Sequence, residues 1–230
     1  ALMERHQEHR KQSPGAYCDA LNLLLTLQIR TRKHKEFLGS IGALKALLQE
    51  TPRNKRTETL RSIISVQLLL LEQTYYIDTG AFSEGTRLTE HAQNWLQKNT
   101  GSYNSFRALL YYNLAHVYFG AGDLSSARKW LNLLMNDPHL SGLYDDVQCF
   151  ARLLNLIIHF ELGNTELLEY IVKSTYRFLY KKEGLNKVET AILHFIRGLT
   201  RITSPKELQD ALVAIFHYIS LRKLKYPLSV

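Results

Sequence analysis

Histidines, cysteines and acidic residues are the side chains that could carry chemistry here, and their spacing limits what they can do. The nine histidines include no HExxH motif and no Glu-x-x-His pair, the patterns that place metal ligands on one helical face. His6 and His9 are one turn apart, but near a chain end we expect them to be solvated. Cys18 and Cys149 fit neither a disulfide framework nor a zinc site, so they are predicted to be small apolar residues in helices of a protein from a reducing compartment.

The acidic residues and the glycines carry no catalytic signature either. Glu72, Glu90, Glu161 and Glu189 lack partners at a spacing that suits acid–base catalysis. No phosphate-cradling glycine loop and no nucleophile elbow occurs in the chain. We therefore expect a protein that is not an enzyme and that has no metal site and no cofactor.

Length and composition are ordinary for a soluble globular protein. The chain has 230 residues, 45% of them hydrophobic and 22% charged, which is enough for a sizeable core. No signal peptide opens it, and no apolar run approaches the roughly 18 residues that cross a bilayer, so a cytoplasmic protein is expected. The chain begins at Ala1 and continues as an exposed helix end, which leaves open that it is a fragment of a longer protein.

The formal charge of +8 raises the question of nucleic-acid binding. Each group of basic residues lies at a predicted helix end or just after it, where cations interact favourably with the helix dipole. We interpret these groups mainly as solvated helix ends, and a phosphate-binding stripe is the alternative. The basic groups are Arg30, Arg32, Lys33 and Lys35; Arg53, Lys55 and Arg56; Lys181, Lys182 and Lys187; and Arg222, Lys223 and Lys225.

Short breaks recur at nearly equal intervals along the chain. Gly80, Gly122, Gly163 and Ser204 mark them, with spacings of 42, 41 and 41 residues, so a unit of that length is predicted. Between the breaks the apolar residues follow the three- and four-residue spacing of amphipathic helices, and no segment alternates like a strand. The sequence therefore predicts an all-α protein.

About five antiparallel helix pairs are predicted, each joined by a tight turn. Such pairs cannot bury their apolar faces alone, so we expect them to stack into an α-solenoid that forms a single domain over residues 1–230. The predicted pairs are Tyr17–Arg32 with Phe37–Gln49, Glu58–Asp78 with Phe82–Gln97, Tyr103–Ala121 with a helix capped by Asp123 and ended by Asp137 and Pro138, Asp145–Leu162 with Thr165–Tyr180, and Lys187–Ile202 with Pro205–Leu224.

The third pair resembles the tetratricopeptide repeat at seven positions, which in order are large, apolar, small, aromatic, glycine, small and large. The second pair matches less well, because Gln73 replaces the small residue and Gly85 stands where alanine is usual. In the fourth pair, Leu156 and Leu168 occupy the small positions. The period also exceeds the family's length of about 34 residues. The chain is thus similar to a divergent tetratricopeptide-like superhelix and resembles uncharacterised bacterial helical proteins, with an armadillo- or HEAT-like solenoid as the structural alternative. The seven residues are Tyr111, Leu114, Ala115, Tyr118, Gly122, Ala127 and Leu131.

The resemblance implies a concave groove lined by the first helix of each pair, which receives a peptide or an amphipathic helix of another protein. A clamp for a peptide's terminal carboxylate is not expected, because Phe150 and Leu154 stand where its basic residues would be. The groove positions of the fourth pair are apolar. We interpret them mainly as core, and an open apolar groove surface is the alternative; they are Phe150, Leu153, Ile157 and Phe160. The expected groove residues are Gln67, Thr74, Tyr112, Asn113, His116, Phe119, His194 and Arg201.

The predicted function is therefore that of a non-catalytic scaffold for protein–protein interaction. The alternative is a nucleic-acid-binding helical solenoid that uses its basic surface and whose affinity falls steeply with salt. Terminal repeats need a polar outer face, and Tyr218, Leu221 and Leu224 would leave an apolar one, through which the chain could form a homo-oligomer.

Overall fold

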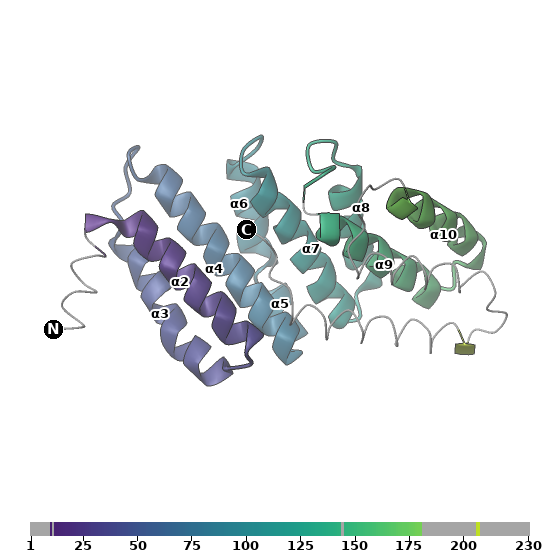
Figure 1. Ribbon diagram of the computed structural model, residues 1–230, viewed down its shortest axis with the longest axis horizontal. Helices are drawn as coiled ribbons and strands as arrows, with labels where there is room; N and C mark the ends of the chain where they lie inside the picture. The colour runs from purple at the N-terminus through teal and green to yellow at the C-terminus, as the bar shows by residue number, and fades with distance from the viewer. Residues whose placement is uncertain (1–9, 11, 144, 181–205, 208–230) are drawn as a thin grey trace. The chain divides into compact units, whose positions relative to one another are not determined.

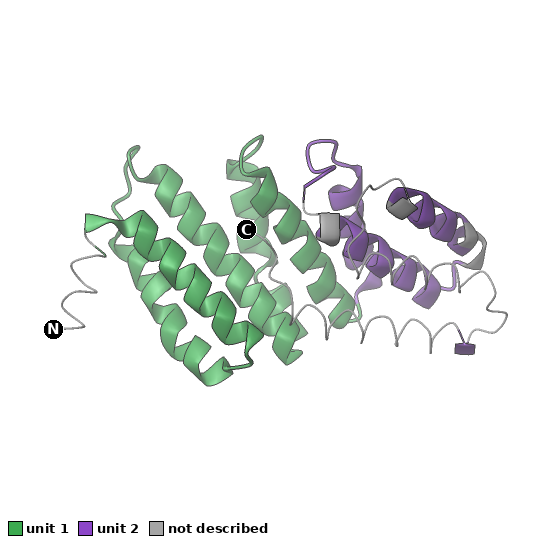
Figure 2. Cartoon of the chain, in the orientation of Figure 1, with its two compact units in different colours: residues 1–122 green, residues 123–230 purple. Residues whose placement is uncertain are grey.

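The structure is a computed structural model that describes residues 10, 12–143, 145–180 and 206–207 (Figure 1). These residues form helices and connections with no strand among them, which confirms the all-α class for this part of the chain. The chain divides into two compact units, residues 1–122 and 123–230 (Figure 2). The fifth predicted pair lies outside the described residues except for Lys206 and Glu207.

The first unit is built around α4. This helix contacts α2 and α3 before it in the chain and α5, α6 and α7 after it, as Figure 1 shows. Helices α2 and α3, which correspond to the first predicted pair, also pack against each other. The helices of this unit are α2 (Pro14–Arg30), α3 (His34–Glu50), α4 (Glu58–Thr79), α5 (Phe82–Thr86), α6 (Thr89–Lys98) and α7 (Asn104–Gly120).

The second unit contains α8 (Leu124–Asn136), α9 (Asp145–Glu161) and α10 (Thr165–Tyr180). Both α8 and α10 pack against α9. As predicted, Asp123 caps α8: its carboxylate accepts a hydrogen bond of 2.9 Å from the backbone N–H of Ser126, which lowers the pKa of Asp123. The helices of the third predicted pair, α7 and α8, thus belong to different units.

The recurring glycines end their helices by one mechanism. Gly80, Gly122 and Gly163 have φ angles of 75°, 82° and 68°, in the left-handed region that suits glycine after a helix. These three predicted breaks are therefore confirmed. Arg32, with φ of 57°, plays the same part after α2, although its side chain makes this conformation more costly.

The expected single helix over Phe82–Gln97 is wrong, because the chain tightens between α5 and α6. There the N–H groups of Arg87 and Leu88 donate to the carbonyls of Glu84 and Gly85, three residues earlier instead of four. Gly85 has a low helix propensity. The helical pattern of the sequence continues through this break, so periodicity alone could not locate it.

Side-chain hydrogen bonds join α4 to the end of α3 and to α6. Arg61 of α4 donates from Nη1 to the carbonyl of Leu48, at 2.6 Å, and to that of Thr51, and so satisfies groups that the end of α3 leaves unpaired. The Nε1 group of Trp95 in α6 donates to the carbonyl of Ser62 at 2.9 Å. The Trp95 ring also lies 5.9 Å from that of Tyr103, which precedes α7.

Glycines also allow α5 to approach α7 closely. A Cβ on Gly85 would lie 2.9 Å from Cγ1 of Val117 and 3.5 Å from Cβ of Tyr76. A Cβ on Gly120 would meet the ring of Phe82. Val117 is fully buried and its β-branched side chain is stiff, so it cannot move aside without disturbing the core.

We predict that Gly85→Ala lowers the free energy of unfolding by about 1–2 kcal/mol, because overpacking against Val117 outweighs the gain in helix propensity. Gly42→Ala is the matched control: Gly42 lies in α3 with no atom within 4 Å of an added Cβ, so this change should stabilise by about 0.5–1 kcal/mol. Urea denaturation of both variants measures the difference. Equal effects of the two substitutions would show that α5 and α7 do not meet at Gly85.

Candidate interaction surface on α4 and α7

Two expected groove residues meet between successive first helices. Nδ2 of Asn113 in α7 lies 3.4 Å from the hydroxyl of Thr74 in α4 and donates to it. The Thr74 hydroxyl in turn donates to the carbonyl of Leu70 at 2.7 Å. Thr74 is exposed and Asn113 is half-buried, so both remain accessible at the surface.

An aromatic pair continues this region along α7. The rings of Tyr112 and His116 meet edge to face with centroids 5.5 Å apart. His116 and Phe119 are half-buried, whereas Tyr112 is only 7% exposed. Tyr112 was expected to face a ligand, but it is part of the packing, and its ring instead supports that of His116.

Gln67 does not belong to an open groove. Its side chain is 7% exposed, and its Oε1 accepts a hydrogen bond of 2.8 Å from the thiol of Cys18 in α2. The expectation that Gln67 lines a groove is wrong for this structure, because α2 packs on α4. His194 and Arg201 lie outside the described residues. We therefore define the α4–α7 surface as Thr74, Asn113, His116 and Phe119.

The cysteines and the apolar positions of α9 behave as interpreted from the sequence. Cys18 and Cys149 are buried and form no disulfide with each other. Phe150, Leu153 and Ile157 are buried, which confirms that they are core, while Phe160 is half-buried. Burial, with a smaller contribution from the negative charge of Asp19, raises the pKa of the Cys18 thiol to about 11.

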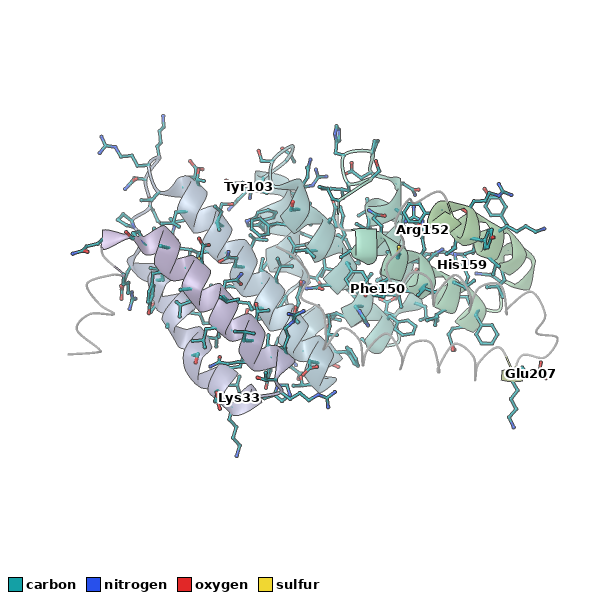
Figure 3. All side chains as sticks on the ribbon, viewed as in Figure 1. Lys33, Tyr103, Phe150, Arg152, His159 and Glu207 are labelled. Atoms are coloured by element: carbon teal, nitrogen blue, oxygen red, sulfur yellow. The ribbon has the colours of Figure 1, made fainter. Side chains whose placement is uncertain are left out.

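Sequence reasoning missed a polar network in the second unit. Arg152 donates to Oε1 of Gln148 at 2.9 Å, and its guanidinium lies 3.5 Å from the centre of the Phe178 ring. Gln148 in turn donates to the carbonyl of Leu140 at 3.0 Å. Burial lowers the pKa of Arg152. The four-residue spacing of Gln148 and Arg152 was the available signal. The network joins α9 to Leu140 before it and to Phe178 of α10 after it, and Figure 3 labels Arg152.

His159 makes a similar structural contact at the other end of α9. Its Nδ1 lies 3.1 Å from Nδ2 of Asn164, which can donate to the neutral ring just before α10. Burial first, and the positive charge of Arg128 second, lower the pKa of His159 and favour this neutral form. The ring therefore supports the turn between α9 and α10.

The described residues show neither a metal-binding group nor a membrane-spanning helix. They contain no group of three or more histidine, cysteine or acidic side chains that could hold a metal ion. In the same part of the chain, each helix is too short or too polar to span a bilayer. The α4–α7 surface is the part of the described chain where two of the expected groove residues are in contact.

The two basic groups within the described residues are separated by α3. Arg32, Lys33 and Lys35 lie at its start, and Arg53, Lys55 and Arg56 follow its end. A helix of 17 residues places them about 25 Å apart. Lys33 also pairs with Glu36 at 3.2 Å. These positions favour solvated helix ends over one continuous stripe.

No protein-family model, curated protein or solved structure matches the chain. The likeness to the tetratricopeptide repeat therefore depends on the residues of the third predicted pair. Function has to be argued from the geometry of the side chains.

Cys18 predicts a pH dependence of stability. A thiol pKa raised from 9.0 to about 11 favours folding fully below pH 9, and this contribution is lost as the pH rises through 11. Relative to Cys18→Ser, which cannot ionise in this range, the wild-type protein should lose about 1 kcal/mol of stability between pH 8 and 10. Urea denaturation at these two pH values measures it, and a constant difference would contradict the prediction.

A second prediction concerns the stability of the core around Gln73, which is a polar residue buried there. It is fully buried, and within the described part of the chain neither its amide nitrogen nor its oxygen has a hydrogen-bond partner. Leaving such a group unpaired costs about 1–3 kcal/mol. Gln73→Met keeps the length of the side chain and should raise the free energy of unfolding by about 1 kcal/mol, measured by urea denaturation. A loss of stability would mean that the amide is hydrogen-bonded in solution.

Proposed function

We propose that this chain is a non-catalytic scaffold for protein–protein interaction, built as a divergent tetratricopeptide-like array, and that it binds an extended peptide or an amphipathic helix. The observation that carries the proposal is the α4–α7 surface. Thr74 of the second predicted pair and Asn113 of the third were both expected at groove positions of the repeat. In the structure these two side chains are in hydrogen-bonding contact. This contact is what stacking of the first helices in register would produce, and it supports the proposal.

The chemistry of this surface suits a peptide backbone. The carboxamide of Asn113 offers both a donor and an acceptor, and Thr74 offers a hydroxyl beside it. To bind a ligand, Asn113 would give up only its weak hydrogen bond of 3.4 Å from Nδ2 to the hydroxyl of Thr74. The partly exposed rings of His116 and Phe119 add an apolar surface that can hold a side chain of the partner. Recognition would therefore combine backbone hydrogen bonds with at least one apolar anchor.

A random peptide library displayed on phage tests this proposal without a known partner. Peptides selected on the wild-type protein are measured again on Asn113→Ala and His116→Ala, with Gln93→Ala on the exposed face of α6 as the control. We expect each surface substitution to weaken binding about tenfold, or about 1.4 kcal/mol, and the control to leave it unchanged. Circular dichroism checks that the variants remain folded.

Two results would contradict the proposal. One is that the selected peptides bind the surface variants as tightly as the wild-type protein. The other is that no peptide is selected, while single-stranded RNA or duplex DNA binds at low salt with an affinity that falls steeply as salt is added. The second result would favour the basic surface as the functional one.

A further inference from the structure

The helices α2, α4 and α7 end in the same way, so equivalent positions on them can be compared. The left-handed residue after each helix donates its N–H to the carbonyl three residues earlier. These residues are Arg32, Gly80 and Gly122. Six residues before them stand Thr26, Thr74 and His116. Thr74 and His116 belong to the α4–α7 surface, so Thr26 is their counterpart in α2.

The α4–α7 surface continues onto α2, because α2 lies beside α4. Figure 1 shows α2, α4 and α7 side by side in that order, and α4 packs against both of the others. A hydrogen bond of 2.8 Å from the thiol of Cys18 to Gln67 joins α2 to α4. Asn22 lies one turn before Thr26 and so shares its face. Asn22 and Thr26 are therefore the part of α2 that borders this surface.

Asn22 and Thr26 have hydrogen-bonding groups that the protein does not use. Both side chains are half-buried. Among the residues that the structure describes, neither the carboxamide nor the hydroxyl has a hydrogen-bond partner. Asn113 adds a carboxamide that is held only by its 3.4 Å contact to Thr74. The three helices thus offer donors and acceptors along one face.

The spacing of the helices indicates the conformation of a bound segment. Helices that pack together lie about 9 Å apart. A polyproline II segment repeats every three residues, or about 9 Å, and its carbonyls have no internal hydrogen bonds. A helical ligand already uses its backbone groups internally, so it would leave the carboxamides of Asn22 and Asn113 without backbone partners. The arrangement therefore favours an extended segment that crosses the three helices.

Charge restricts the composition of that segment. The middle of each helix, residues 18–29, 67–77 and 108–119, contains no lysine or arginine, although the protein has a net charge of +8. The acidic residues in these ranges are Asp19, which is exposed, and Glu72, which pairs with a lysine of α3 at 2.7 Å. No lysine or arginine in these ranges can pair with a carboxylate or phosphate of a partner. The face therefore suits an uncharged segment.

We propose that the α4–α7 surface extends through Asn22 and Thr26 and receives an uncharged segment of another protein in the polyproline II conformation. Side chains of α2, α4 and α7 would donate to carbonyls of the segment about every third residue. The half-buried rings of His116 and Phe119 would contact its side chains. This inference rests on the proposed function, because it names the partner of the same surface and adds residues of α2 to it.

Peptides selected from the phage library on the wild-type protein, and then synthesised, test the part played by α2. Thr26→Val keeps the shape of the side chain and removes its hydroxyl, and Asn22→Ala removes the carboxamide. We expect each change to weaken peptide binding about fivefold, as for the loss of one hydrogen bond. Asn94→Ala, at an exposed position of α6, is the matched control and should leave binding unchanged. Circular dichroism checks that the variants remain folded.

The outcome separates this inference from the proposed function. Unchanged binding by Thr26→Val and Asn22→Ala, together with weaker binding by Asn113→Ala, would overturn the extension onto α2 and leave the proposed function standing. Unchanged binding by Asn113→Ala would contradict the proposed function itself. A library that yields no peptide would contradict the proposed function and this inference with it.

Substitutions in the peptide test its conformation and charge, and they need no protein variant. Proline should be tolerated at most interior positions of a selected peptide, whereas a helical ligand would lose about 100-fold in affinity at each. The dissociation constant should change less than about twofold between about 50 and 500 mM NaCl, because no ion pair is formed. Peptides that lose binding at every interior proline, or that are acidic and bind with a steep salt dependence, would overturn the proposal.

Discussion

The structure depends on one constraint: a pair of helices has more apolar surface than the two helices can cover for each other. In the first unit α4 packs against helices on both sides of it in the chain, so Leu68, Leu69 and Leu71, together with Gln67 and Gln73, are buried. Hydrophobic burial of this kind is the main favourable contribution to folding. The positions of the accessible side chains, and of the closely packed glycines, follow from it.

Much of the helical layout could be predicted from the sequence, because periodicity and helix-ending residues are local signals. Gly80, Gly122 and Gly163 are recognisable since glycine is the residue that adopts a left-handed conformation most easily. Arg32 adopts the same conformation but carries no such signal. The break between α5 and α6 was missed for a related reason. It lies beside the close approach of Gly85 to Val117, a contact between segments distant in sequence that local periodicity does not report.

The candidate site was predictable only in part. The repeat offsets selected Asn113 and Thr74 separately, and the structure shows that the two side chains are in contact, because both positions depend on helix register. A residue's position within the repeat could not show that Gln67 and Tyr112 are buried. Burial is decided by neighbouring helices and by the direction of each side chain. The network of Arg152, Gln148 and Phe178 likewise joins residues whose types are unremarkable until packing brings them together.

The contact from Arg61 to the last carbonyls of α3 has a consequence for the order in which the protein folds. An isolated helix in water satisfies such carbonyls with solvent, and its final turn frays readily. Here the donor belongs to the following helix, so the final turn of α3 is held only once α4 has docked. The two helices should therefore protect their amides from hydrogen exchange together, as one cooperative folding unit instead of two successive ones.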